Sequence, residues 1–166
     1  MAILNHDKKF IFIHVPRTGG HSAYELLGGK SEGALHPRRI VMEERYFSFG
    51  FVRNPWGRMY SLYRRQKVMP KYKHVVFKEY LLERLKGNHV ENCAMWFLSG
   101  CDFIGRYENL QADWDYILNR IGMTPRTLPH LNKYGDADYQ KHYDNEMIEH
   151  IALHHKPDID WGGYTF

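Results

Sequence analysis

Cysteine is scarce in this sequence, and long apolar runs are absent. The chain of 166 residues has two cysteines, Cys93 and Cys101, which are too few for a disulfide framework and match no zinc-site spacing. No apolar run reaches the length of a membrane span, and the opening MAILNHDKKF lacks the apolar stretch of a signal peptide. We therefore expect reduced, buried thiols in a soluble cytoplasmic protein that has no membrane partner.

Metal-ligand motifs are missing as well. The eleven histidines include no H-E-x-x-H or similar ligand spacing. His154 and His155 are adjacent, so on one helix their side chains would point to different faces. The sequence therefore predicts no metal site.

Acidic residues are absent from one segment, residues 53–73. Its cations are Arg53, Arg58, Arg64, Arg65, Lys67, Lys71 and Lys73, in a chain whose net charge is +4. Such a segment suits an anionic partner: a nucleotide, a phosphorylated or sulfated small molecule, or nucleic acid. A solvated helix face is the alternative interpretation. We expect no nucleic acid as partner, because the segment begins inside a motif that a smaller ligand explains.

Strands and helices alternate along the chain. Strands are predicted at 10–15, 46–52 and 101–107, and helices at about 20–28, 37–44, 54–66, 75–86, 90–98, 108–121 and 139–155. This alternation predicts an α/β fold with a mainly parallel sheet, in a single domain that spans residues 1–166. We assign one helical stripe to the core rather than to a ligand: Trp56, Met59, Tyr60 and Tyr63.

Two strand-to-helix junctions share one arrangement. In FIFIHVPRTGGHS (10–22) an apolar strand passes through Pro16 and two glycines to a helix start, and in YFSFGFVRNP (46–55) a strand runs into an Asn N-cap. Open α/β sheets bind ligands at the carboxyl ends of their strands, and helix N-termini attract anions. Two such junctions on neighbouring strands predict a ligand with two separated anionic groups.

Several segments resemble sulfotransferases that use 3′-phosphoadenosine 5′-phosphosulfate (PAPS), especially their carbohydrate branch. HVPRTGGHS resembles the family's H-[VI]-P-K-T-G-G-T-S loop, and FVRNPWGRMYSLY resembles its signature [FV]-V-R-[ND]-P-x-x-R-x-x-S-x-[YF]. FIGRYENLQADWDYILNRIGM, LPHLNK, HYDNEMIEHI and the closing WGGYTF are similar to later segments, in the same order. The resemblance spans nearly the whole chain, although residues 66–100 are shorter and less recognisable than in larger relatives.

The resemblance implies a P-loop NTPase-like three-layer fold and sulfuryl transfer from PAPS, without a metal, to a hydroxyl or amine of a saccharide or small-molecule acceptor. It implies that the 5′-phosphosulfate is held by Arg17, Thr18, Gly19, Gly20, His21 and Ser22, and the 3′-phosphate by Arg53 and Ser61. Lys133, in LPHLNK, would reach the cofactor or an acidic acceptor, unless it is a solvated loop lysine. Arg58 also matches a motif position, where a structural ion pair is the alternative.

Two positions depart from the family's pattern. Arg17 stands where the family has a Lys that neutralises charge on the leaving phosphate, and an Arg can do this electrostatically. His21 replaces a phosphate-binding Thr, so its ring either donates a hydrogen bond there or disturbs the site. As the general base we favour His36, then His21, then Glu43 or Glu44.

Two further hypotheses about function stay open, in addition to sulfuryl transfer and nucleic-acid binding. A phosphotransferase of the same broad fold would need the G-K-[ST] that this loop lacks. The other hypothesis is a protein that binds PAPS or 3′,5′-ADP without turnover. It would explain why Arg17 and His21 depart from the family's pattern. Residues 66–100 are expected to shape the acceptor site.

Overall fold

The computed structural model describes residues 2–27, 46–86, 93–128 and 138–166. They form an α/β protein that divides into two compact units. The sheet unit comprises Met1–Val52 and Phe97–Asn132, and the helical unit comprises Arg53–Trp96 and Lys133–Phe166. We describe each unit by itself, and the expectation of a single domain stays a prediction.

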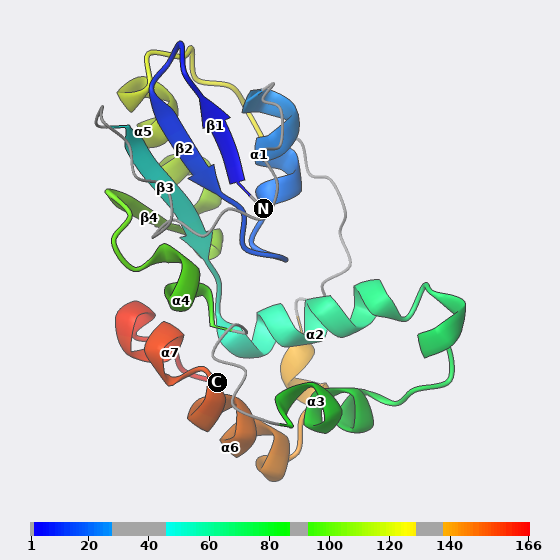
Figure 1. The fold of residues 1–166 in the computed structure, drawn as a ribbon. Helices are drawn as coiled ribbons and strands as arrows, with labels where there is room; N and C mark the ends of the chain where they lie inside the picture. The colour runs from blue at the N-terminus through cyan, green and yellow to red at the C-terminus, as the bar shows by residue number, and fades with distance from the viewer. Residues whose placement is uncertain (1, 28–45, 87–92, 129–137) are drawn as a thin grey trace. The chain divides into compact units, whose positions relative to one another are not determined.

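The sheet unit contains a four-stranded mixed sheet (Figure 1). Its strands are β1 (Ala2–Asn5), β2 (Phe10–Ile13), β3 (Phe47–Val52) and β4 (Phe103–Arg106), in the order β1-β2-β3-β4. Strand β1 pairs antiparallel with β2, and the other two pairings are parallel. The three parallel strands confirm the prediction, whereas β1 was not expected from the sequence.

Two helices pack on the sheet through one shared core. Helix α1 (Gly20–Leu27) and helix α5 (Leu110–Arg120) contribute buried side chains to the same cluster as the strands. The rings of Phe12 and Phe49 lie 5.4 Å apart, and Trp114 of α5 lies 6.4 Å from Phe49. Every residue of β2 is buried, which explains why this strand is apolar throughout rather than alternating.

The helical unit is organised around α2 (Pro55–Gln66). Its other helices are α3 (Phe77–Leu85), α6 (Asn145–His154) and α7 (Lys156–Gly162), with 3₁₀ turns at Pro70–Tyr72 and Tyr139–His142. Its core includes Trp56, Met59, Tyr60, Tyr63, Phe77, Tyr80, Leu81, Leu85, Met147 and Ile151. The apolar stripe predicted for α2 is therefore confirmed. One boundary between the two units falls between Val52 and Arg53, and another falls within α4 (Ala94–Leu98).

The predicted elements are confirmed with shorter ends. Strand β2 stops at Ile13, and the helix expected over 139–155 becomes α6 only at Asn145. Helix α7 was not expected, and the short helix predicted at 37–44 lies outside the described residues. None of the described helices has the length and apolar character needed to cross a membrane.

Both cysteines are free thiols. Cys93 is buried and Cys101 is half-buried. Burial raises the pKa of Cys93 to about 11 and that of Cys101 to about 12, so both are protonated at neutral pH. Neither thiol is a reactive nucleophile in this state.

Candidate functional site

The first candidate site is the loop that joins β2 to α1 in the sheet unit. The strand ends at Ile13, and the helix begins at Gly20. Within the loop, Arg17 has φ +69° and Gly19 has φ +82°. For an arginine this left-handed backbone costs on the order of 1–3 kcal/mol, and such strain is concentrated at functional sites. The loop therefore has a defined, unfavourable local shape that its surroundings maintain.

Thr18 closes this loop. Its side chain is buried, and its hydroxyl donates a hydrogen bond to the Val15 carbonyl oxygen at 2.9 Å. A hydroxyl has a single proton to donate, so Thr18 can offer a ligand only its oxygen lone pairs or its backbone N–H. The hydroxyl proton of Thr18, a residue that the resemblance assigns to the 5′-phosphosulfate, is thus used within the loop.

Both glycines of the loop have a packing role. A Cβ on Gly20 would lie 2.1 Å from Cδ2 of His14, and a Cβ on Gly19 would lie 2.7 Å from Cδ2 of Leu110. The resemblance implied that these glycines hold the 5′-phosphosulfate. Within the sheet unit, close approach to His14 and to α5 already requires them.

The start of α1 offers backbone donors. The N–H groups of Ser22 and Ala23 both donate to the Gly19 carbonyl oxygen, at 3.1 and 3.4 Å. The amides of Gly20 and His21 come before these bonds, in the part of a helix where N–H groups have no intrahelical acceptor. The first turn contains no acidic residue, and the His21 side chain is exposed. This end of the helix is therefore favourable for an anion.

His14 is a loop residue that the sequence analysis did not select. Burial, together with nearby positive charge that includes His21 and Arg17, lowers its pKa to about 4. His14 is therefore neutral at pH 7. Its position directly after an apolar strand and six residues before Gly20 was visible in the sequence, but its contact with Gly20 was not.

The second candidate site lies at the start of α2 in the helical unit. The Asn54 side chain accepts hydrogen bonds from the N–H groups of Trp56 and Gly57, at 3.1 and 3.4 Å. Asn54 is thus the predicted N-cap, and Pro55 occupies the first helical position. Arg53 is half-buried, whereas Ser61 is fully buried. Because the helix supplies its own cap, a ligand here would have to lie along α2 rather than on its tip.

Arg58 is part of a buried ion pair. Its Nη2 lies 3.7 Å from Oδ2 of Asp158, and both side chains are almost inaccessible to solvent. Burial lowers the pKa of Arg58, although the charge of Asp158 opposes this change. Burial alone would raise the pKa of Asp158, but hydrogen bonding from His155 and the charge of Arg58 bring it below its usual value. The structural alternative stated for Arg58 is therefore observed.

Cys93, His155 and Asp158 bring potential metal ligands together around this pair. One ligand-type atom from each lies within 4.8 Å of the others, and all three residues are buried. The carboxylate of Asp158 already accepts hydrogen bonds from the N–H groups of Ala94 and Met95, at 2.9 and 2.8 Å. Since Arg58 also supplies a positive charge beside this carboxylate, the described contacts give the cluster a structural role.

This cluster was missed because Cys93 is distant in sequence from His155 and Asp158. The prediction that the side chains of His154 and His155 point to different faces assumed one continuous helix. In the structure α6 ends at His154 and α7 begins at Lys156, so His155 occupies the junction and turns inward. Pro157, two residues after His155, was the available signal for that break.

The predicted site residues fall in different parts of the chain. Arg17, Thr18, Gly19, Gly20, His21 and Ser22 lie together in the sheet unit, and Arg53 and Ser61 lie in the helical unit. His36, Glu43, Glu44 and Lys133 lie outside the described residues. Each motif is thus described within its own unit, and a ligand that engages both motifs stays a prediction.

The comparison with known proteins found a distant relative. An uncharacterized protein from Archaeoglobus fulgidus is 29% identical over 105 residues, which cover 58% of this chain and 84% of the relative. No family model matches the chain. No solved structure matches it either.

Proposed function

We propose that this protein is a sulfotransferase with a P-loop NTPase-like fold. It transfers the sulfuryl group of PAPS to a hydroxyl or amine of a saccharide or small-molecule acceptor. The observation that carries the proposal is the β2–α1 loop, in which left-handed Arg17 and Gly19 lead into a helix start that has no acidic residue. The motif resemblance at both strand-to-helix junctions supplies the choice of sulfuryl over phosphoryl transfer.

Arg17 is the proposed charge for the leaving group. In the reaction, an acceptor oxygen or nitrogen forms a bond to sulfur while the bond from sulfur to the bridging phosphate oxygen breaks. The electron pair stays with the phosphate, and a base takes the acceptor's proton. A guanidinium beside that phosphate stabilises the negative charge that develops there. The amides of Gly20 and His21 would add donors to the same group.

His36 is the first candidate for the base, followed by His21. His21 is exposed at the first turn of α1, where a neutral ring could accept a proton. His14 is a less suitable base, because burial and neighbouring positive charge keep its pKa near 4. Arg53 and Ser61 are the proposed ligands of the 3′-phosphate, and Lys133 would reach the nucleotide or the acceptor.

The direct test measures transfer of labelled sulfate from PAPS across a panel of saccharide and small-molecule acceptors. Arg17→Ala is expected to lower kcat by about 100-fold or more, because it removes charge stabilisation from the leaving group. Arg53→Ala is expected to weaken binding of 3′,5′-ADP by about tenfold or more. The matched control is Arg126→Ala, which removes an exposed arginine outside both motifs and should change neither quantity.

The outcomes separate this proposal from its alternatives. If the wild-type protein does not bind 3′,5′-ADP, or if Arg53→Ala leaves the affinity for it unchanged, the proposal fails. Tight binding without transfer to any acceptor, with transfer restored by Arg17→Lys and His21→Thr together, would identify a binding protein that has lost turnover. Magnesium-dependent ATP hydrolysis would favour a phosphotransferase.

A further inference from the structure

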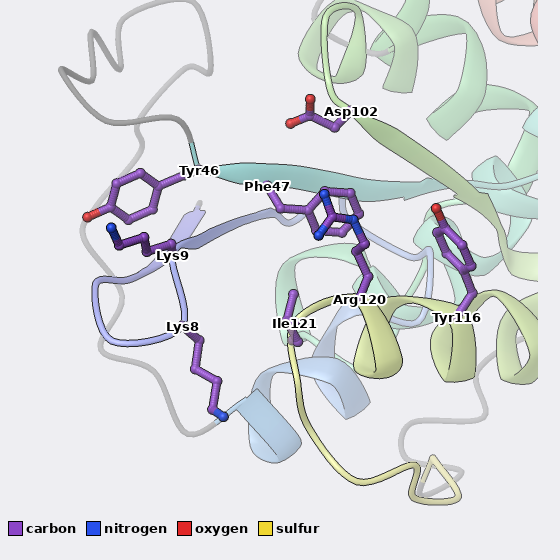
Figure 2. Close-up of a pocket in the computed structure, with 8 residues that line it drawn as sticks. All are labelled: Lys8, Lys9, Tyr46, Phe47, Asp102, Tyr116, Arg120 and Ile121. Carbon is purple, nitrogen blue, oxygen red and sulfur yellow. The ribbon is translucent and has the colours of Figure 1, made fainter.

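A separate pocket lies within the sheet unit, at the end of the sheet where the parallel strands begin (Figure 2). Its volume is about 510 Å³, within the range of about 300–1,000 Å³ that is usual for small-molecule sites. It is lined by Lys8, Lys9, Tyr46, Phe47, Asp102, Tyr116, Arg120 and Ile121. The β2–α1 loop leaves the opposite end of β2, so this pocket is not part of the proposed PAPS site.

Positive charge predominates in this pocket. Three of the lining residues are cationic, Lys8, Lys9 and Arg120, and one is acidic, Asp102. Oδ2 of Asp102 accepts hydrogen bonds from the N–H and the hydroxyl of Ser48, at 2.8 and 2.7 Å. These bonds hold the carboxylate against the start of β3. An anion in the pocket would therefore meet more cationic than acidic groups.

Among the cations that line the pocket, Arg120 has a guanidinium whose orientation suits ligand binding. Its guanidinium carbon lies 5.2 Å from the centre of the Phe47 ring, so the ring supports one side of the group. Among the residues that the structure describes, no carboxylate lies within ion-pair distance of it. A stacked guanidinium keeps its N–H donors at its edges, where they can bind two oxygens of one oxyanion. Figure 2 shows Arg120 beside Phe47 in the pocket.

The pocket also offers an aromatic surface. Tyr116 packs against Phe103 with ring centres 4.7 Å apart, yet 51% of it remains exposed. Tyr46 is positioned by His6, whose Nδ1 lies 2.8 Å from the Tyr46 hydroxyl oxygen. A planar ring on a ligand can stack on Tyr116 while its anionic group reaches Arg120.

We infer that this pocket binds a small aryl phosphate or aryl sulfate. Arg120 binds the oxyanion, and Tyr116 binds the ring. Lys8 stabilises the local backbone, because its Nζ donates to the Gly122 carbonyl oxygen at 2.9 Å and so ties the turn before β2 to the end of α5. The inference does not depend on the proposed sulfotransferase activity.

The test titrates the full chain with phenyl phosphate, phenyl sulfate and inorganic phosphate, by calorimetry and by backbone amide NMR shifts. Shifts from both esters are expected at residues 8–9, 46–47 and 120–122. Arg120→Gln should weaken phenyl phosphate binding by about tenfold, since it removes a charged hydrogen-bond donor. Lys156→Gln is the matched control: it removes one exposed positive charge, paired with Asp160 on α7. It should leave the affinity unchanged.

A second variant tests the aryl group. Tyr116→Leu should reduce the affinity for phenyl phosphate to that for inorganic phosphate. Equal affinity of the wild-type protein for these two probes would overturn the aryl-ester assignment. Equal losses of phenyl phosphate affinity in Arg120→Gln and Lys156→Gln would show general charge attraction. That result would overturn the assignment of this pocket as the binding site.

The experiment also separates this pocket from the proposed PAPS site. Shifts confined to residues 15–22 would overturn the pocket inference while agreeing with an anion-binding β2–α1 loop. Failure of PAPS-dependent transfer, together with the expected Arg120 effect, would overturn the sulfotransferase proposal and support the pocket.

Discussion

Arg17 and Arg58 show two uses of arginine in the two units of this chain. Arg17 lies half-buried in a loop of the sheet unit, with a left-handed backbone beside a helix start. Arg58 lies in the helical unit, buried against Asp158 inside a helix. The same side chain thus lies in one unit beside a helix start, where we propose that it binds an anion, and in the other unit in an internal ion pair. Burial and backbone conformation, rather than residue type, make this difference.

The largest expected effect is a loss of folding stability, and it follows from breaking the buried Arg58–Asp158 pair of the helical unit. Arg58→Ala would leave the Asp158 carboxylate buried without its counter-charge, so we expect unfolding stability to fall by about 3–5 kcal/mol. Urea denaturation measures the change. Arg126→Ala removes an exposed arginine and should stay within about 0.5 kcal/mol of wild type. A similar small loss for Arg58→Ala would contradict its structural role.

The next effect tests the electrostatics of the sheet unit. Because the pKa of His14 falls from 6.5 to about 4 on folding, the unfolded chain binds more protons in this pH window. The stability linked to His14 is present above pH 6.5 and is lost as the pH falls to 4, by about 2–3 kcal/mol.

The measurement is a series of urea denaturations from pH 7 to pH 4. His14→Gln has no titrating ring, so its stability should fall less than that of wild type over this window. His155 is present in both proteins, and the difference between them therefore isolates His14. Parallel pH profiles would show that His14 is not the responsible group.

The smallest effect tests how the β2–α1 loop is packed. Gly20→Ala places a Cβ against the His14 ring, and we expect a loss of about 2 kcal/mol. His14→Ala combined with Gly20→Ala should recover part of this loss, because the contacting ring is gone. Strictly additive losses in the double variant would mean that another contact requires the glycine.

The sequence predicted the parallel strands and the caps with local signals. The run FIFI predicted a buried strand, and Asn54-Pro55 predicted the start of α2, because strand burial and N-capping depend on nearby residues. It missed β1 and α7. MAILN is too short to predict a strand without its partner, and α7 follows a helix break at His155.

The candidate site was predicted less completely. The loop residues 17–22 were found as a group, but Thr18 proved to close the loop through Val15. The sequence also explained Gly20 by a ligand, whereas His14 already requires it. These contacts could not be predicted, because they depend on how the turn folds back on the end of the strand.

The sequence by itself determined the alternation of strands and helices, the two basic motifs and the apolar stripe of α2. All of these are encoded by spacing within short segments. Only the tertiary structure decided which arginine is buried, which hydroxyl is used internally, and which distant residues surround Asp158. It also placed Lys8, Lys9 and Arg120 around one pocket. Such groupings follow from strand pairing and helix packing, which bring together residues that no local pattern connects.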